Sequence, residues 1–355
     1  MVGRALGGRM RSLRVLRWLP FVVMLGVALT DLLAGESLVF LPLLTLGPAF
    51  ASVSGGVRRT AAVGAVALAI CVPMAVYNDL LFTWENNLTL IGIAGVTGAS
   101  MLAARLRLQR ERELASVRRV AEVAQRVLLR PVPRRAGDLR VALSYTSAQA
   151  EARIGGDLYE IVTTPHGVRL LIGDVQGKGL AAVETAAWVL GAFREAAYDQ
   201  ADPADIGERL EASLARHLGG EQFVTAIVAE VHDTEMTLVN FGHPPPLLIL
   251  ADGGLRTAEP PEQGLPLGLG SFDSSAVKAH RIPFGRGDRV LFFTDGVIEA
   301  RNAAGEFYPL AERAWLLRRD DPQAALDALR ADLVEHTGGP LLDDAAMLLL
   351  HRPGD

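Results

Sequence analysis

The chain has 355 residues, half of them apolar, and its mean hydropathy is slightly positive, which is high for a soluble protein. Its formal charge of -5 argues against a nucleic-acid-binding protein, and its single cysteine, Cys71, excludes a disulfide framework and a cysteine-based zinc site. These totals predict two or three units, of which one lies in a membrane.

Four apolar segments near the start of the chain predict an all-α transmembrane region over residues 1–104. Residues 37–56, 60–78 and 88–104 carry no charged side chain, and each approaches the roughly 20 residues that cross a bilayer. Residues 18–33 form a shorter fourth candidate. For this first segment a secretory signal peptide is the alternative, because an arginine-rich start precedes a modest apolar run.

The positions of arginine predict the orientation of these spans. Arginines precede the first span, lie between the second and third at Arg58 and Arg59, and follow the fourth. The other two loops hold acidic residues but no basic ones. Because cationic loops tend to stay in the cytoplasm, we expect a multi-pass protein of the cell membrane with both termini and the C-terminal domain in the cytoplasm.

A charged helix-forming segment from about Met101 to Arg130 contains neither glycine nor proline, so it predicts a continuous helix leaving the membrane. Residues 105–133 would then be a cytoplasmic linker, since Pro131 and Pro133 end the helix. Apolar residues recur in it at spacings of three and four: Leu114, Val117, Ala121, Ala124 and Leu128. This seam fits a homodimeric coiled coil or packing on the helix's own domain equally well.

Short apolar runs alternate with helical stretches in residues 134–355, which form the predicted soluble domain. The predicted strands are 139–145, 158–163, 168–174, 223–231, 235–241, 246–250, 276–282, 289–294 and 345–351, and the predicted helices are 180–199, 203–218, 308–319 and 322–337. Several links are too short for a crossover helix, as at Pro165 to Gly167, so much of the sheet must be antiparallel. The fold class is therefore α+β.

Four aspartates stand at the ends of apolar runs: Asp157 in GGDLYE, Asp174 in IGDVQGKGLAA, Asp295 in FFTDGVIEA and Asp343 in DDAAMLLL. Each alone is more often a turn residue than a ligand. Together they offer the oxygen donors that Mg²⁺ and Mn²⁺ prefer, and no closely spaced histidine pair competes for zinc. Two such ions about 3.5–4 Å apart activate a shared water and clamp phosphoryl oxygens. The set therefore predicts phosphate hydrolysis.

Seven motifs, in this order, resemble the metal-dependent protein serine/threonine phosphatases of the protein phosphatase 2C type, in their bacterial SpoIIE-like branch: GGDLYE, GDVQGKGLAA, FVTAIVAEV, NFGHPPPLLI, GLPLGLG, TDGVIEARNAAGEFYP and DDAAMLLLHR. The resemblance covers about residues 120–352. It implies a four-layer αββα sandwich of two antiparallel sheets and a binuclear Mn²⁺ or Mg²⁺ centre. It also implies a phosphoprotein substrate, which in this branch is often an antagonist of an anti-sigma factor.

The resemblance also implies a ligand set of four aspartates and one backbone carbonyl: Asp157, Asp174, Asp295, Asp343 and Val175. Asp174 would bridge both ions, Asp157 would hold one, and Asp295 and Asp343 would hold the other. Catalysis would depend on Asp174 and Asp157 through these ions. Alignment on the DD start favours Asp343, with Asp344 as the alternative.

Other positions depart from the family pattern or have two interpretations. Eukaryotic relatives carry a histidine, proposed as general acid, where Gln176 stands, and an amide releases no proton near neutral pH. Arg153 is a loosely placed candidate for the phosphate-binding arginine. Lys178 either adds positive potential or is a solvated loop residue. We expect structural roles for His243 in GHPPP and for Thr225.

Two alternative functions remain at this point. GGDLYE also resembles the GGDEF signature of diguanylate cyclases, but Leu158 stands where that signature has an acidic residue, and a cyclase leaves TDG and DDAA unexplained. The second is a phosphatase-fold module that senses or binds a partner without turnover. The missing general acid favours it, and the presence of all four aspartates opposes it. In either phosphatase-fold case, the linker helix is the expected path for a signal from the membrane.

Overall fold

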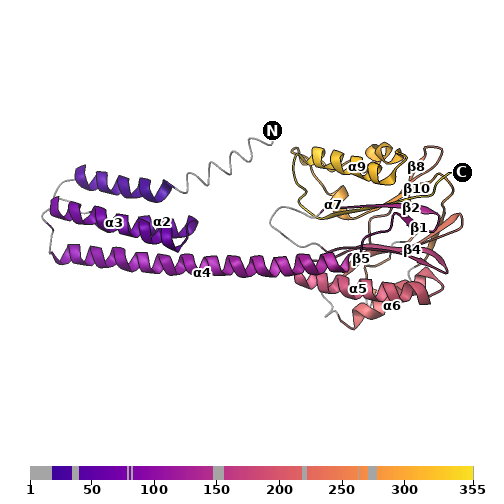
Figure 1. The fold of residues 1–355 in the computed structure, drawn as a ribbon, viewed down its shortest axis with the longest axis horizontal. Helices are drawn as coiled ribbons and strands as arrows, with labels where there is room; N and C mark the ends of the chain where they lie inside the picture. The colour runs from indigo at the N-terminus through magenta and orange to yellow at the C-terminus, as the bar shows by residue number, and fades with distance from the viewer. Residues whose placement is uncertain are drawn as a thin grey trace. The chain divides into compact units, whose positions relative to one another are not determined.

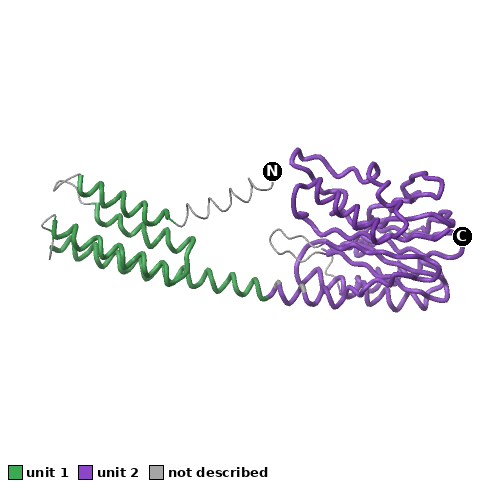
Figure 2. The backbone as a smooth tube through the Cα atoms, turned by 45° about the horizontal axis from the view of Figure 1, so that its top comes forward, with its two compact units in different colours: residues 1–116 green, residues 117–355 purple. Residues whose placement is uncertain are grey.

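The computed structural model describes residues 18–33, 40–77, 80, 83–146, 156–217, 222–262, 264–270 and 278–354. The chain divides into two compact units, residues 1–116 and 117–355 (Figure 2). The predicted boundaries of the transmembrane region and the linker, after residues 104 and 133, stay predictions.

The first unit consists of apolar helices. They are Trp18–Leu33, the 3-10 turn η2 (Leu41–Thr45) continuing into α2 (Leu46–Ser54), α3 (Val57–Tyr77) and the first part of α4 (Trp84–Leu128). By length and composition, α3 and α4 can cross a membrane, which is weak support for membrane anchoring, and the other helices are shorter. The predicted four spans and their orientation stay predictions, because the arginines at the chain start lie outside the described residues.

A glycine allows α3 and α4 to approach closely. A Cβ atom at Gly64 would lie 2.3 Å from Cγ2 of Thr97 on α4, so any larger residue would push these helices apart. Small and apolar side chains fill the rest of the interior, among them Ala67 and Cys71, which are fully buried. Cys71 is therefore a packing residue, as expected from its apolar surroundings.

The predicted fourth span and linker helix form one continuous helix, α4. In the second unit, Ala121 of α4 is buried against Val183, with Ala124 and Leu128 packed beside them. This part of the predicted seam packs on its own domain. Val117, by contrast, is 53% exposed.

Two antiparallel sheets form the centre of the second unit (Figure 1). The first has the order β1 (Arg135–Ala136), β2 (Leu139–Thr146), β11 (Ala345–His351), β10 (Arg289–Phe293), β7 (Leu247–Ile249) and β8 (Leu255–Thr257). The second has the order β3 (Asp157–Thr164), β4 (Gly167–Val175), β5 (Val224–His232), β6 (Glu235–Phe241) and β9 (His280–Pro283). All strand pairs in both sheets are antiparallel, as the short links predict.

Helices cover the outer face of each sheet and complete four layers (Figure 1). The five-stranded sheet packs on α5 (Leu180–Asp199) and α6 (Pro203–Ala215), and the six-stranded sheet packs on α9 (Pro322–Thr337) with α8 (Leu310–Arg313) and η4 (Ala314–Arg318). Apolar side chains of both inner faces form a third core between the sheets. The predicted helix 308–319 is instead two short pieces, α8 and η4.

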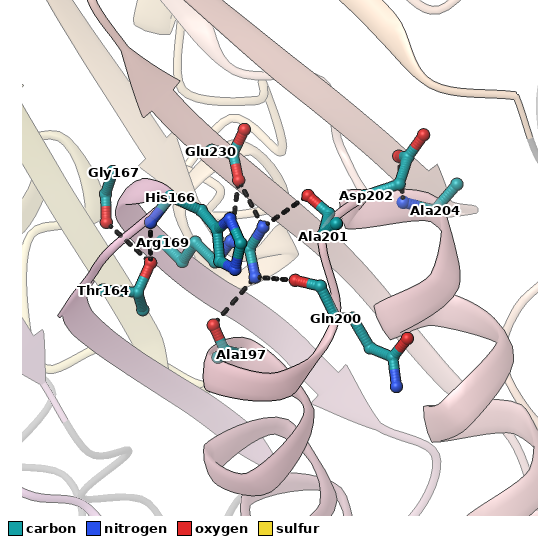
Figure 3. A network of polar contacts seen from close by, with 10 residues as sticks. All are labelled: Thr164, His166, Gly167, Arg169, Ala197, Gln200, Ala201, Asp202, Ala204 and Glu230. Atoms are coloured by element: carbon teal, nitrogen blue, oxygen red, sulfur yellow. Dashed lines mark hydrogen bonds and ion pairs between the residues drawn. The ribbon is translucent and has the colours of Figure 1, made fainter.

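Arg169 on β4 anchors the C-terminal end of α5 (Figure 3). Its side chain is fully buried, and its guanidinium donates to the Glu230 carboxylate at 2.7 Å. It also donates to the carbonyl oxygens of Ala197, Gln200 and Ala201 at 2.8, 2.5 and 2.9 Å. Because the last carbonyls of a helix have no partner within the helix, this arginine satisfies groups that burial would otherwise leave unpaired.

Candidate metal centre

The four predicted aspartate ligands come from both sheets. Asp157 is the first residue of β3, and it is the register partner of Asp174 near the end of β4, so the two lie side by side on neighbouring strands. Asp295 begins the short helix α7 (Asp295–Ile298) shortly after β10, and Asp343 precedes β11. Since β10 and β11 are antiparallel neighbours, the end of the first lies beside the start of the second.

Thr294 joins the two sheets at this edge. It is fully buried between β10 and Asp295, and its hydroxyl donates to Oδ2 of Asp157 at 3.0 Å. The Thr294 hydroxyl oxygen also accepts from the backbone N–H of Ala346 on β11 at 2.9 Å. Thr294 was missed in the sequence, although it directly precedes the aspartate in TDGVIEA. It brings the carboxylate of one sheet to the aspartates of the other.

Electrostatic coupling shows that the aspartates share one region. Burial and the charge of Asp174 raise the pKa of Asp157 well above its ordinary value. Burial and the charges of Asp295 and Asp343 raise the pKa of Asp174 to about 7. The pKa of Asp295 is raised by burial and by Glu299. Carboxylates that raise one another's pKa carry uncompensated negative charge, which a divalent cation neutralises.

The local backbone also leaves room for an ion. A Cβ atom at Gly156 would lie 2.6 Å from Oδ1 of Asp174 and 2.3 Å from the carbonyl oxygen of Val175, two of the predicted ligand atoms. Only glycine therefore keeps this space open. The all-oxygen donor set fits Mn²⁺ or Mg²⁺. In the part of the chain that the structure describes, no group of three or more His, Cys, Asp or Glu stands at the spacing of one ion, so the ligand roles stay predictions.

The two aspartates before β11 have different surroundings. Asp344 is 3% exposed, and its Oδ2 accepts from the Tyr145 hydroxyl at 2.7 Å. The side chain of Asp343 is 53% exposed and pairs with Nζ of Lys178 at 2.5 Å. Both aspartates contribute to the raised pKa of Asp174, so both lie near the bridging position, and the choice between them stays open. Lys178 makes an ion pair instead of standing alone in its loop.

His243 links the two sheets and has a structural role, as expected. Its Nδ1 accepts from the Thr225 hydroxyl on β5 at 3.0 Å, and its Nε2 donates to the Phe293 carbonyl on β10 at 3.2 Å. Asn240 holds the loop by donating to the His243 carbonyl and accepting from its backbone N–H. Burial lowers the pKa of His243 to about 4, so the ring is neutral. Both ring nitrogens bond to groups of the two sheets, which is what the expected structural role requires.

Two other predicted positions contribute less. Gln176 lies exposed in the loop after β4, and its backbone N–H donates to the Phe223 carbonyl at 2.9 Å. Its amide offers no acidic proton at the place of the eukaryotic histidine. Arg153 lies outside the described residues, so its proposed contact with phosphate stays a prediction.

A cavity of ≈ 470 Å³ lies near His243 and the end of α7. Prolines and an aliphatic side chain line it, among them Pro244, Pro260 and Ile298, together with the carboxylate-bearing Glu259. Ile298 ends α7, whose first residue is Asp295, so one helical turn of about 4–5 Å separates the two.

Comparisons with known proteins bear on the family and the fold. The family model of Stage II sporulation protein E (SpoIIE) matches residues 164–353. The SiaA-PP2C domain of Pseudomonas aeruginosa is similar in structure, with a TM-score of 0.56 and 17% identity over 68% of this chain and 98% of that chain. The PP2C phosphatase domain of SpoIIE from Bacillus subtilis, solved with a fragment of its regulatory domain, gives a TM-score of 0.51 and 16% identity over 61% and 64%.

A third structure contains the RsbU and RsbW domains of Rv1364c from Mycobacterium tuberculosis, with 26% identity, a TM-score of 0.49 and coverage of 61% of this chain and 60% of that chain. The chain therefore spans less than two thirds of two of these three relatives. The structural likeness confirms the predicted α+β fold of two antiparallel sheets with outer helices.

Proposed function

Because the chain belongs to the SpoIIE family and carries a phosphatase domain of the protein phosphatase 2C type, we propose that it hydrolyses phosphoserine and phosphothreonine in a protein substrate. The observation that most supports this proposal is the proximity of aspartates from two sheets: Thr294, next to Asp295, donates to Asp157, and the charges of Asp295 and Asp343 raise the pKa of Asp174. No single strand or loop explains these carboxylates in one region, where Asp157 is buried and Asp174 and Asp295 are half-buried. Their mutual repulsion is a cost that a cation relieves.

Each of the predicted ligands would have its own role in binding the two ions. Asp174 would lie between two ions, Asp157 would hold one, and Asp295 and Asp343 would hold the other, with the Val175 carbonyl as a further donor. When bound, Mn²⁺ or Mg²⁺ supplies a water of lowered pKa and positive charge for the phosphoryl oxygens.

The neighbours of these aspartates orient them for that role. Thr294 occupies Oδ2 of Asp157 and so fixes the orientation of that carboxylate. Lys178 adds positive charge at the exposed side of Asp343.

The first unit would anchor this domain in the cell membrane, with several spans and both termini in the cytoplasm. The apolar helices α3 and α4 support that proposal. Family membership supports a phosphoprotein partner that antagonises an anti-sigma factor. A membrane-anchored phosphatase of this kind would connect a signal at the membrane to sigma-factor regulation.

A non-catalytic module with the phosphatase fold is the second candidate. Two observations favour it: Gln176 replaces the general acid of eukaryotic relatives, and the aspartates of the described residues do not stand at the spacing of one ion. Such a module would bind a phosphoprotein without turning it over.

Hydrolysis assays with the full chain in detergent separate the two candidates. We expect Mn²⁺-dependent hydrolysis of p-nitrophenyl phosphate and of a phosphoserine protein, and its loss on chelation. Asp174→Asn should lower the rate by more than about 100-fold, the upper range for changes one shell away from a metal. Glu335→Gln, an exposed change on α9, is the control and should leave the rate unchanged. Activity that survives both chelator and Asp174→Asn contradicts the metal mechanism, and a folded but inactive chain supports the non-catalytic module.

A further inference from the structure

Tyr145 of β2, which no sequence motif marks, joins α4 to the aspartates before β11. Its hydroxyl donates to Oδ2 of Asp344 at 2.7 Å and accepts from Nε2 of Gln125 on α4 at 3.1 Å. A phenol is protonated at neutral pH, so it can donate and accept at the same time. A chain of two hydrogen bonds therefore runs from α4 to Asp344, across residues that are 20 and 199 positions apart in sequence.

Asp344 is placed to position both predicted ligands of the second ion. Its backbone N–H donates to Oδ1 of Asp343 at 2.9 Å. Its carbonyl oxygen packs directly on Gly296, where a Cβ atom would lie only 1.8 Å from it. Gly296 follows Asp295 on α7. A shift of Asp344 would consequently displace Asp343 and Asp295 together.

The end of α4 also contacts the other half of the site. Ala121 is buried against Val183 of α5, and Nη2 of Arg194 on α5 donates to the Leu128 carbonyl at 2.8 Å. The loop that follows Asp174 and the end of β4 leads directly into α5. The last turns of α4 thus lie against α5, the helix that follows Asp174. Gln125 on the same turns contacts β2 through Tyr145, and Tyr145 in turn contacts Asp344.

We propose that Tyr145 is a positioning residue through which α4 sets the affinity of the site for its second ion. A displacement of α4 that breaks the bond between Gln125 and Tyr145 lets the Tyr145 hydroxyl turn and weakens its bond to Asp344, the residue that contacts both Asp343 and Gly296 beside Asp295. This inference rests on the proposed function, since it requires a divalent-ion centre at these aspartates. The effect of α4 on the site would pass through two hydrogen bonds, from Gln125 to Tyr145 and from Tyr145 to Asp344.

Calorimetric titration of the full chain with Mn²⁺, without substrate, tests the route independently of turnover. Tyr145→Phe keeps the ring, which lies 6.2 Å from that of Tyr159, and removes only the hydroxyl. We expect about tenfold weaker binding of the weaker ion, with kcat unchanged once Mn²⁺ is saturating. Gln125→Leu should weaken binding less, and should add nothing in the Tyr145→Phe background, because on the proposed route Gln125 reaches the aspartates through that hydroxyl. Arg126→Gln, exposed on the same helix, is the control.

Hydrogen exchange supplies the reciprocal measurement. Coupling between two sites acts in both directions, so Mn²⁺ should protect the backbone amides of residues 117–128 in the unmodified chain and not in Tyr145→Phe. An unmodified chain that binds no Mn²⁺ refutes the proposed function. Normal Mn²⁺ affinity in Tyr145→Phe, even with a lowered unfolding midpoint, refutes the coupling and leaves the phosphatase proposal standing. Additive losses in the double variant refute it in the same way.

Discussion

Replacing Arg169 with methionine should strongly destabilise the second unit. The buried guanidinium makes two contacts with the Glu230 carboxylate and three with carbonyls at the end of α5 (Figure 3). Methionine keeps much of the aliphatic volume but leaves Glu230 charged and unpaired. Removing one partner of a buried ion pair costs about 3–5 kcal/mol, which is a large share of the roughly 5–15 kcal/mol that stabilises a domain.

The measurement is the thermal unfolding midpoint of the full chain in detergent. In a unit of this size, 1 kcal/mol shifts the midpoint by about 2–4 °C, so Arg169→Met should lower it by roughly 6–20 °C. Arg169→Lys keeps the charge but not the planar guanidinium, so its unfolding midpoint should lie between those of the unmodified chain and Arg169→Met. Combining Arg169→Met with Glu230→Met removes both charges and should recover part of the loss.

Two results would refute this reasoning. A loss below about 1 kcal/mol for Arg169→Met would mean that the network contributes no more than an exposed ion pair does. A double variant no more stable than Arg169→Met would show that the unpaired charge of Glu230 is not the cause. Because Arg169 anchors α5, the helix that follows β4 and Asp174, we expect activity to persist well below the midpoint and to fall as the temperature approaches it.

Two further predictions concern the aspartates. Lys178→Met should raise the affinity for Mn²⁺ by up to about fivefold, because the ammonium group at 2.5 Å from Asp343 competes with the cation. Calorimetric titration with Mn²⁺ measures this affinity, and Lys278→Met, which breaks the ion pair to Glu262, is the control. An unchanged or weaker affinity in Lys178→Met contradicts the prediction. In chelator, the unfolding midpoint of the unmodified chain should fall relative to that of Asp174→Asn as pH rises from about 5 to 8, because the folded pKa of Asp174, about 7, lies above its ordinary value and the folded state keeps a proton that the unfolded state releases. His243 and His351, whose pKa values are lowered to about 4, oppose this trend equally in both variants and so cancel in the difference; Mn²⁺ should reduce the difference, and a midpoint difference that does not change with pH would contradict the assignment.

Most of the fold could be predicted from local pattern. Alternating apolar residues and short links gave β2, β4 and β11 to within a residue of their observed ends, because each strand buries at least one face. The two- and three-residue strands β1 and β8 are too short to show a period. Tertiary packing, not local propensity, divides the predicted helix 308–319 into α8 and η4.

The four aspartates of the candidate site could be predicted from the sequence, but the contacts that orient their side chains could not. Asp157, Asp174, Asp295 and Asp343 stand at ends of apolar runs, which a motif records. The bond from Thr294 to Asp157 joins residues 137 positions apart, across two sheets. No local pattern encodes such a contact, because it depends on the final register of strands that pair with other neighbours. The sequence therefore predicted the donors and left their orientation to the structure.

The seam of α4 shows the same limit for a surface. A spacing of three and four marks an apolar stripe but does not say what covers it. Ala121 packs on Val183 of its own domain. The neighbouring residues Val120, Val123 and Val127 form a stripe on α4 and are 61%, 56% and 75% exposed. The predicted homodimer through the linker helix stays a prediction. If residues 121–128 keep their packing, a dimer contact in the second unit would use the exposed Val117 and this valine stripe, because the same side chains cannot pack on two partners at once.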